Sequence, residues 1–270
     1  MTSPRTRAAT ILAVLVVSTG VVACSSTEDG AGPDRSAAPT STAPTSTASK
    51  RLASPDVDTF DVEGGTATLA CQGSGSVPVI LVAGPDDPVS RWDTLVDDIG
   101  QEVLVCRFAA PPETTPATPT SEADALSQTL DASGLPGPYV IVAHALGGFS
   151  VRRFGERHPD KLGGALFLDP SAPTALPDEM TAAGWDPTAT RADVDAPAPW
   201  PEVPVSILIH ALTGEPAGAD SPGSDATRAF YSALVANARV EVVDGSEGDV
   251  DLDATRQVTN EIDRIIEGVN

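Results

Sequence analysis

The chain has 270 residues, of which 41% are hydrophobic, and its formal net charge at pH 7 is −22. This length accommodates one domain of about 200 residues together with additional segments. The acidic balance excludes the basic face that nucleic-acid binding requires, so no nucleic-acid partner is expected.

The first 23 residues have the features of an export signal. Arg5 and Arg7 form a positive region, and residues 8–17 are an apolar stretch too short to span a bilayer. The Val-Val-Ala-Cys segment at 21–24 resembles the lipobox of bacterial lipoproteins, which implies cleavage before Cys24 and a diacylglycerol on its sulfur. We therefore expect a lipoprotein anchored to the outer face of the cell membrane. An ordinary secretory signal with a chance cysteine is the alternative.

Residues 24–58 are rich in Ser, Thr, Ala and Pro and contain no aromatic residue. This composition cannot bury a core, and it predicts a disordered tether before a folded domain at 59–270. Besides Cys24, the chain has Cys71 and Cys106. In an oxidising compartment this even pair predicts a disulfide, and two buried free thiols are the alternative.

From residue 59 onward the pattern alternates between strands and helices. Strands are expected at 60–62, 66–71, 77–83, 102–108, 139–142, 162–168, 203–210 and 239–243. Helices are expected at 90–99, from Ser121 to a stop at Gly134 with Asp124 completing a capping box, and at 146–158, 226–238 and 254–268.

This alternation predicts an α/β fold in which helices cover both faces of a mostly parallel sheet. The segment 172–202 is rich in Pro, Ala and Asp and is expected to be a lid or an insertion. Apart from that segment, we expect a short or absent cap.

The strand at 139–142 runs into the turn Ala-His-Ala-Leu-Gly at 143–147 and then into a helix. This is the layout of the nucleophile elbow, G-x-S-x-G, with Ala145 where the serine would stand. Residues 136–148 resemble the segment PGPYVLVGHSLGG of small secreted α/β-hydrolases of actinobacterial type. Segments 71–84, 157–171 and 245–253 resemble other parts of this family in the same order. The resemblance implies an α/β-hydrolase fold, whereas the site has to be analysed separately.

The resemblance also implies a dismantled catalytic site. A serine hydrolase needs a nucleophile, a histidine base, an orienting acid and two backbone donors for the oxyanion. Ala145 occupies the nucleophile position and Gly248 the base position. Leu146 keeps one backbone donor, but the second falls on Pro85, which has no N–H.

The remaining candidate residues define an acid and a pocket. Asp169, at the end of a strand, is the candidate remnant acid, and Glu215 and Asp220 are alternatives. The pocket is expected at Gly84, His144, Leu146 and His210. Residues 249–253 have the acidic pattern of a calcium loop, but Ala and Asn stand at its sixth and twelfth positions, so neither a metal nor a cofactor is expected.

Three functions are consistent with these features. The first is a catalytically inactive envelope lipoprotein that binds a small apolar or acyl ligand or an envelope protein. The second is an esterase-like or lipase-like hydrolase with an unconventional site, using Ser150, Ser171 or Ser246 as the attacking oxygen and His210 as the base. The third is a structural surface protein with a filled pocket. The sequence leaves the oligomeric state open.

Overall fold

The structure is a computed structural model that describes residues 56–85, 87–112, 117–171, 181, 184–196, 199–211, 225–233, 238–244 and 254–269. Its strands are β1 Asp56–Val62, β2 Gly65–Gln72, β3 Val79–Val82, β4 Val105–Ala109, β5 Tyr139–His144, β6 Leu162–Leu168, β7 Val205–Ala211 and β8 Arg239–Asp244. Its helices are the 3-10 turn η1 Val89–Trp92 and the α-helices α1 Asp93–Ile99, α2 Pro119–Ser133, α3 Gly147–Arg157, α5 Pro187–Asp195, α6 Asp225–Ser232 and α8 Thr255–Val269. Within these ranges, no helix has both the length and the apolar character needed to cross a membrane.

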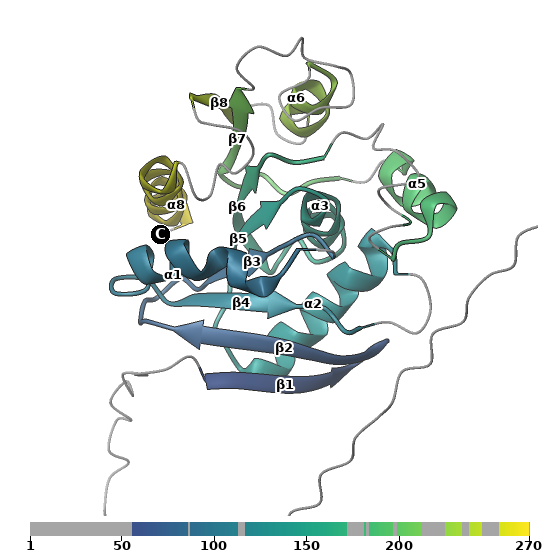
Figure 1. The fold of residues 1–270 in the computed structure, drawn as a ribbon, viewed down its shortest axis with the longest axis horizontal. Helices are drawn as coiled ribbons and strands as arrows, with labels where there is room; N and C mark the ends of the chain where they lie inside the picture. Colours follow the sequence, from purple (N-terminus) through teal and green to yellow (C-terminus); the bar gives the residue numbers. More distant parts are fainter. Residues whose placement is uncertain are drawn as a thin grey trace, which may run out of the picture. The chain divides into compact units, whose positions relative to one another are not determined.

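The strands form one eight-stranded sheet in the order β1-β2-β4-β3-β5-β6-β7-β8 (Figure 1). The β1–β2 and β2–β4 pairs are antiparallel, and every other pair is parallel. This confirms the predicted mostly parallel α/β fold. β1 begins at Asp56, three residues before the expected start of the domain.

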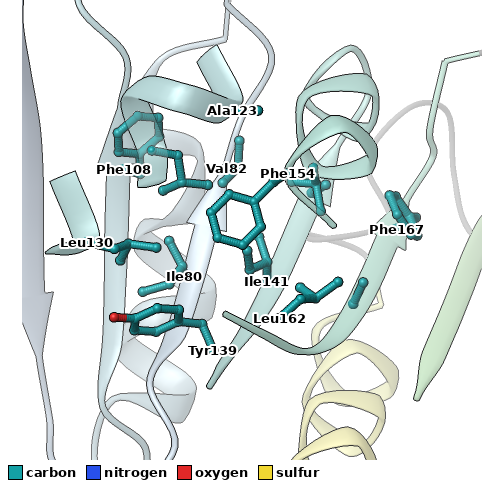
Figure 2. Close-up of a cluster of buried hydrophobic side chains, with 14 of the residues drawn as sticks. Ile80, Val82, Phe108, Ala123, Leu130, Tyr139, Ile141, Phe154, Leu162 and Phe167 are labelled. Carbon is teal, nitrogen blue, oxygen red and sulfur yellow. The ribbon is translucent and has the colours of Figure 1, made fainter. Parts of the chain in front are cut away.

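The two faces of the sheet are buried under different helices. α1 and α8 lie on one face, and α2, α3 and α6 lie on the other (Figure 1). Along β3, Ile80 and Val82 belong to the cluster packed under α2 and α3, while Val79 and Leu81 belong to the opposite cluster. This alternation is the period of two that a strand imposes, and apolar residues at all four positions explain why β3 reads as a continuous apolar run. Figure 2 shows the first cluster around Ile80, Ile141 and Phe154.

The start of α2 differs from the prediction. The helix begins at Pro119, and Thr118 is its N-cap rather than Ser121. The Thr118 hydroxyl accepts the Ser121 N–H at 3.1 Å, and the Ser121 hydroxyl accepts the Thr118 N–H at 2.9 Å. The predicted box of Ser121 and Asp124 is therefore wrong, because proline suits the first helical position and moves the start of the helix upstream.

The predicted disulfide is present. Cys71 of β2 and Cys106 of β4 stand directly opposite each other in the antiparallel ladder and are joined through their sulfurs. The bond links the antiparallel part of the sheet to the strand next to β3.

Candidate functional site

The turn after β5 has the backbone geometry of a nucleophile elbow. Ala145 has a φ of +47°, a left-handed conformation that costs an L-residue about 1–2 kcal/mol. Its N–H donates to the Leu168 carbonyl at 3.2 Å, and α3 starts two residues later at Gly147. A Cβ at Gly147 would lie 2.7 Å from the Ala83 carbonyl oxygen, so only glycine fits where α3 crosses the end of β3. Ala145 therefore has the left-handed backbone of a nucleophile position, but its side chain is a methyl group without an oxygen.

The backbone donors on either side of this turn are unequal. Leu146 is the N-cap of α3, so its N–H lies at a helix start, where backbone donors have no partner within the helix. On the other side, Gly84 and Pro85 follow β3, and proline cannot donate. The roles of Leu146 as a kept oxyanion donor and of Pro85 as a lost one stay predictions.

His144, which precedes the elbow, is bound on both ring nitrogens. Its Nδ1 lies 2.8 Å from Asp87 Oδ2, and its Nε2 lies 3.1 Å from an Nη of Arg91. Because arginine can only donate, these contacts assign a neutral imidazole whose Nδ1–H donates to Asp87 and whose Nε2 accepts from Arg91. Trp92 packs edge-on against the ring. His144 is therefore held in the protein and is not presented as a base.

Asp87 carries the charge of this cluster. Burial opposes its ionisation, but the hydrogen bond from His144 and the charge of Arg91 outweigh burial and lower the pKa of Asp87. Arg91 Nη1 lies 2.8 Å from Asp87 Oδ1. Asp87 and Arg91 thus form an ion pair, and His144 forms a hydrogen bond with each of them.

Asp169 follows β6, the strand beside β5. It is buried, it has a φ of +40°, and its N–H donates to the Leu208 carbonyl at 2.9 Å. Ala145 and Asp169 are the two non-glycine residues with positive φ in the part of the chain that the structure describes. Such strain gathers at functional sites, and here it lies at the carboxyl ends of two adjacent strands.

The remaining predicted residues are only partly described. His210 lies in β7, where its backbone pairs with Val243 of β8. Its side chain is outside the description, as are Gly248, the alternative acids Glu215 and Asp220, Ser246, and the segment 249–253. Elsewhere in the described ranges, no three His, Cys, Asp or Glu side chains are grouped so that they could hold a metal ion.

Ser150 and Ser171, the two described candidates for an unconventional nucleophile, have different surroundings. Ser150 is buried in α3, and its hydroxyl donates to Glu122 Oε2 at 2.7 Å. Ser171 lies next to the elbow, because its N–H donates to the Ala145 carbonyl at 3.2 Å.

A cavity of about 380 Å³ lies at the carboxyl ends of β3 and β4, and its lining includes Ala83, whose carbonyl lies against Gly147 of the elbow. Ligands of open α/β sheets bind at such strand ends. The cavity is lined by Val82, Ala83, Gly84, Pro85, Asp87, Val89, Phe108, Ala109, Ala110, Pro111, Pro112, Ala117, Glu122 and Gly184.

This lining includes some of the predicted residues and adds a new one. Gly84 and Pro85 belong to it, whereas His144 and Leu146 do not. Glu122 of α2 was missed by sequence reasoning, because a glutamate in the first turn of a helix is an ordinary favourable choice for the helix dipole.

Solved structures that share this fold include an esterase, a carboxylesterase and an enol-lactonase. The chain matches a thermophilic esterase from Thermogutta terrifontis at 17% identity and a TM-score of 0.58, covering 79% of this chain and 99% of that one. It matches the carboxylesterase CesB of Bacillus subtilis at 14% identity and a TM-score of 0.60, covering 78% and 91%. It matches the enol-lactonase of Burkholderia xenovorans LB400 at 12% identity and a TM-score of 0.59, covering 76% and 100%.

The chain therefore has the α/β-hydrolase fold. At these identities the likeness establishes the fold alone, and the activity depends on the site. No protein-family model and no curated protein sequence matched the chain.

Proposed function

We propose that this chain is a catalytically inactive protein of the α/β-hydrolase fold that binds a small ligand in the cavity beside the vacated elbow. The observation that carries the proposal is Ala145. It keeps the left-handed geometry of a nucleophile position but has no side-chain oxygen. A cavity of about 380 Å³, lined largely by Val, Ala, Pro and Phe residues, lies at the carboxyl end of β3, where Ala83 also approaches Gly147 of the turn.

Magnitudes argue against a weak enzyme at this position. Loss of triad members can leave about 10³- to 10⁴-fold catalysis over water, carried by the oxyanion hole and by substrate binding. Loss of one oxyanion donor removes about a further 10²- to 10³-fold. The chain combines Ala145 with Pro85, and His144 has both ring nitrogens engaged. Together these changes remove almost all of the usual rate enhancement.

We further propose that the protein acts at the outer face of the cell membrane, anchored through acyl chains on Cys24. The support is the signal-like N-terminus, and stable anchoring requires more than one acyl chain. Mass spectrometry of the N-terminal peptide should find acylated Cys24. Cys24→Ala should release the protein from the membrane fraction, and retention of this variant would contradict the anchor.

The absence of hydrolase activity can be tested directly on the full chain. We expect no labelling by a fluorophosphonate probe and no cleavage of p-nitrophenyl esters above that of the unfolded chain. Clear labelling of the wild-type chain would refute the proposal.

Restoring the missing groups tests whether the scaffold is otherwise intact. Ala145→Ser combined with Gly248→His should produce esterase activity, whereas either change alone should not. Adding Pro85→Leu should raise this activity, because it returns a backbone N–H. If no combination is active, the pocket beside the elbow does not accept an ester.

One observation favours an unconventional hydrolase as the second candidate. Ser171 is held at the elbow by the bond from its N–H to the Ala145 carbonyl. If this serine were the nucleophile, the wild-type chain would turn over esters and Ser171→Ala would abolish the turnover. An inactive wild-type chain would exclude this candidate.

A further inference from the structure

We infer that Trp185 is a specificity-determining residue, whose indole limits the cavity to a short apolar ligand. The inference rests on the proposed function, because it requires the cavity to accept a small ligand. It deepens that function by naming the class of ligand, a short neutral alkyl chain, and the side chain that sets its greatest length.

Trp185 lies directly behind three residues of the cavity lining. Gly184 precedes it in the chain, Ala117 pairs with its backbone in a parallel bridge, and Glu122 Oε1 accepts its indole N–H at 2.8 Å. Trp185 itself is 1% exposed and does not belong to the lining. The indole is therefore one layer of atoms behind the cavity wall.

The indole also packs against the start of α3. Trp185 belongs to a buried apolar cluster whose other members are Ala117, Leu146, Phe149 and Val194. The centre of its ring lies 6.5 Å from that of Phe149. Leu146 is the N-cap of α3 and directly follows the vacated nucleophile position. Trp185 thus connects the cavity wall to the helix that follows the elbow, and it occupies space into which a longer ligand would have to extend.

Hydrogen bonds from two places along the chain hold the indole in this position. The Ala117 N–H donates to the Gly184 carbonyl at 3.2 Å, and the Asp186 N–H donates to the Ala117 carbonyl at 3.0 Å. Farther along, the Thr120 N–H of α2 donates to Asp193 Oδ2 of α5 at 3.0 Å. The segment that carries the indole is therefore docked onto the start of α2 on both sides. A fixed wall of this kind selects by size, because a close-packed interior does not yield to an extra methylene without strain.

The wall in front of Trp185 suits a neutral alkyl chain. Most of it is made of Val, Ala, Pro and Phe side chains, including Val82, Val89 and Phe108. The volume of about 380 Å³ corresponds to about a dozen waters at their share of liquid volume. An extended chain leaves part of this space unfilled, so its limit falls below a dozen non-hydrogen atoms. Each methylene that enters should raise the affinity about fourfold, and a methylene beyond the limit should add nothing.

The test measures the greatest ligand length with 1-butanol, 1-hexanol, 1-octanol and 1-decanol, titrated onto the full chain under ligand-detected NMR. In the wild-type chain the affinity should rise about fifteenfold at each step of two methylenes while the alcohol fits, and 1-decanol should bind no more tightly than 1-octanol. Trp185→Ala removes the indole and opens a void behind the wall. In this variant 1-decanol should bind about tenfold or more tightly than 1-octanol, because its last two methylenes enter the void.

Two control variants separate the size of the indole from other effects. Trp185→Phe removes the N–H donor but keeps an aromatic ring, and it should leave the limit at 1-octanol. Trp200→Ala makes the same change at a tryptophan that packs against Gly155 and Phe167, outside the cavity lining, and it should also leave the limit unchanged. If Trp185→Ala does not fold, Trp185→Leu makes a smaller opening and should raise the affinity for 1-decanol about threefold or more over that for 1-octanol.

The outcomes distinguish this inference from the proposal beneath it. If the affinity of the wild-type chain still rises from 1-octanol to 1-decanol, or if Trp185→Ala has the wild-type limit, Trp185 does not set the ligand length although the cavity remains a ligand site. An equal shift in Trp200→Ala would also overturn the inference, because it would show a general loosening of the chain. If the wild-type chain binds none of the alcohols up to their solubility limits, the inference and the ligand-binding function both fail.

Discussion

Replacing Arg152 by methionine should loosen the segment that connects β6 to β7. Arg152 of α3 is 7% exposed, and its guanidinium donates to the carbonyls of Val194 at 2.6 Å and Ala196 at 3.2 Å. These carbonyls lie at the end of α5, where a helix has acceptors without intrahelical partners. The guanidinium also lies 4.7 Å from the centre of the Phe230 ring, and its Nε lies 2.9 Å from Glu156 Oε1.

The magnitude follows from these contacts. A hydrogen bond to a charged group contributes about 1.5–3 kcal/mol, and a desolvated cation–π contact about 2 kcal/mol. Methionine keeps the apolar stem, and Glu156 keeps its ion pair with Arg153, so the losses are not simply additive. Burial raises the pKa of Glu156 against the attraction of Arg152 and Arg153, and loss of Arg152 should raise it further. We expect Arg152→Met to lower the free energy of unfolding by about 3–5 kcal/mol.

The assay is urea unfolding followed by circular dichroism, with limited proteolysis reporting on α5. Arg191→Met is the matched control, because Arg191 lies in α5 and pairs with Asp195 at 2.8 Å while both side chains are more than half exposed. An exposed pair of this kind contributes about 0–1 kcal/mol. If Arg152→Met costs no more than Arg191→Met, Arg152 does not hold the segment and the reasoning is refuted.

Three further predictions concern the sheet and the elbow. Removing the disulfide with Cys71→Ala and Cys106→Ala should cost about 4 kcal/mol, the chain-entropy value for its separation of 35 residues, and an unchanged denaturation midpoint would contradict this. Asp87→Asn should destabilise most at neutral pH. The folded pKa of Asp87 lies below its ordinary value of 3.8, so its contribution is complete above that pH and is lost as the pH falls through the folded pKa. A wild-type-to-variant difference in unfolding free energy that persists at the acidic end would show that Asp87 does not stabilise the fold through its ionised form. Ala145→Gly should stabilise the chain by up to about 1 kcal/mol by relieving the positive φ, and a lower melting temperature would refute the strain.

The order of strands and helices was predictable because short-range patterns of apolar residues and glycines indicate where each element begins and ends. Continuous apolar runs marked the buried parallel strands, and Gly134 marked the end of α2, where its φ is +68°. The pair Cys71 and Cys106 was predictable from composition and compartment alone, and the disulfide is confirmed. The vacated positions Ala145 and Gly248 depend on motif spacing and stay predictions about catalysis.

Tertiary structure decided which side chains act together. His144 was expected in the pocket, yet its ring is bound to Arg91 and Asp87, 53 and 57 residues earlier in the chain. Glu122 is held by Ser150 and Trp185, 28 and 63 residues later, and no local pattern relates these positions. Local periodicity fixes which face a residue occupies, but a hydrogen bond between distant segments depends on the packed geometry of the whole sheet. The sequence by itself therefore determined the fold and predicted a vacated nucleophile position, whereas only the folded chain placed a carboxylate in the cavity at the ends of β3 and β4.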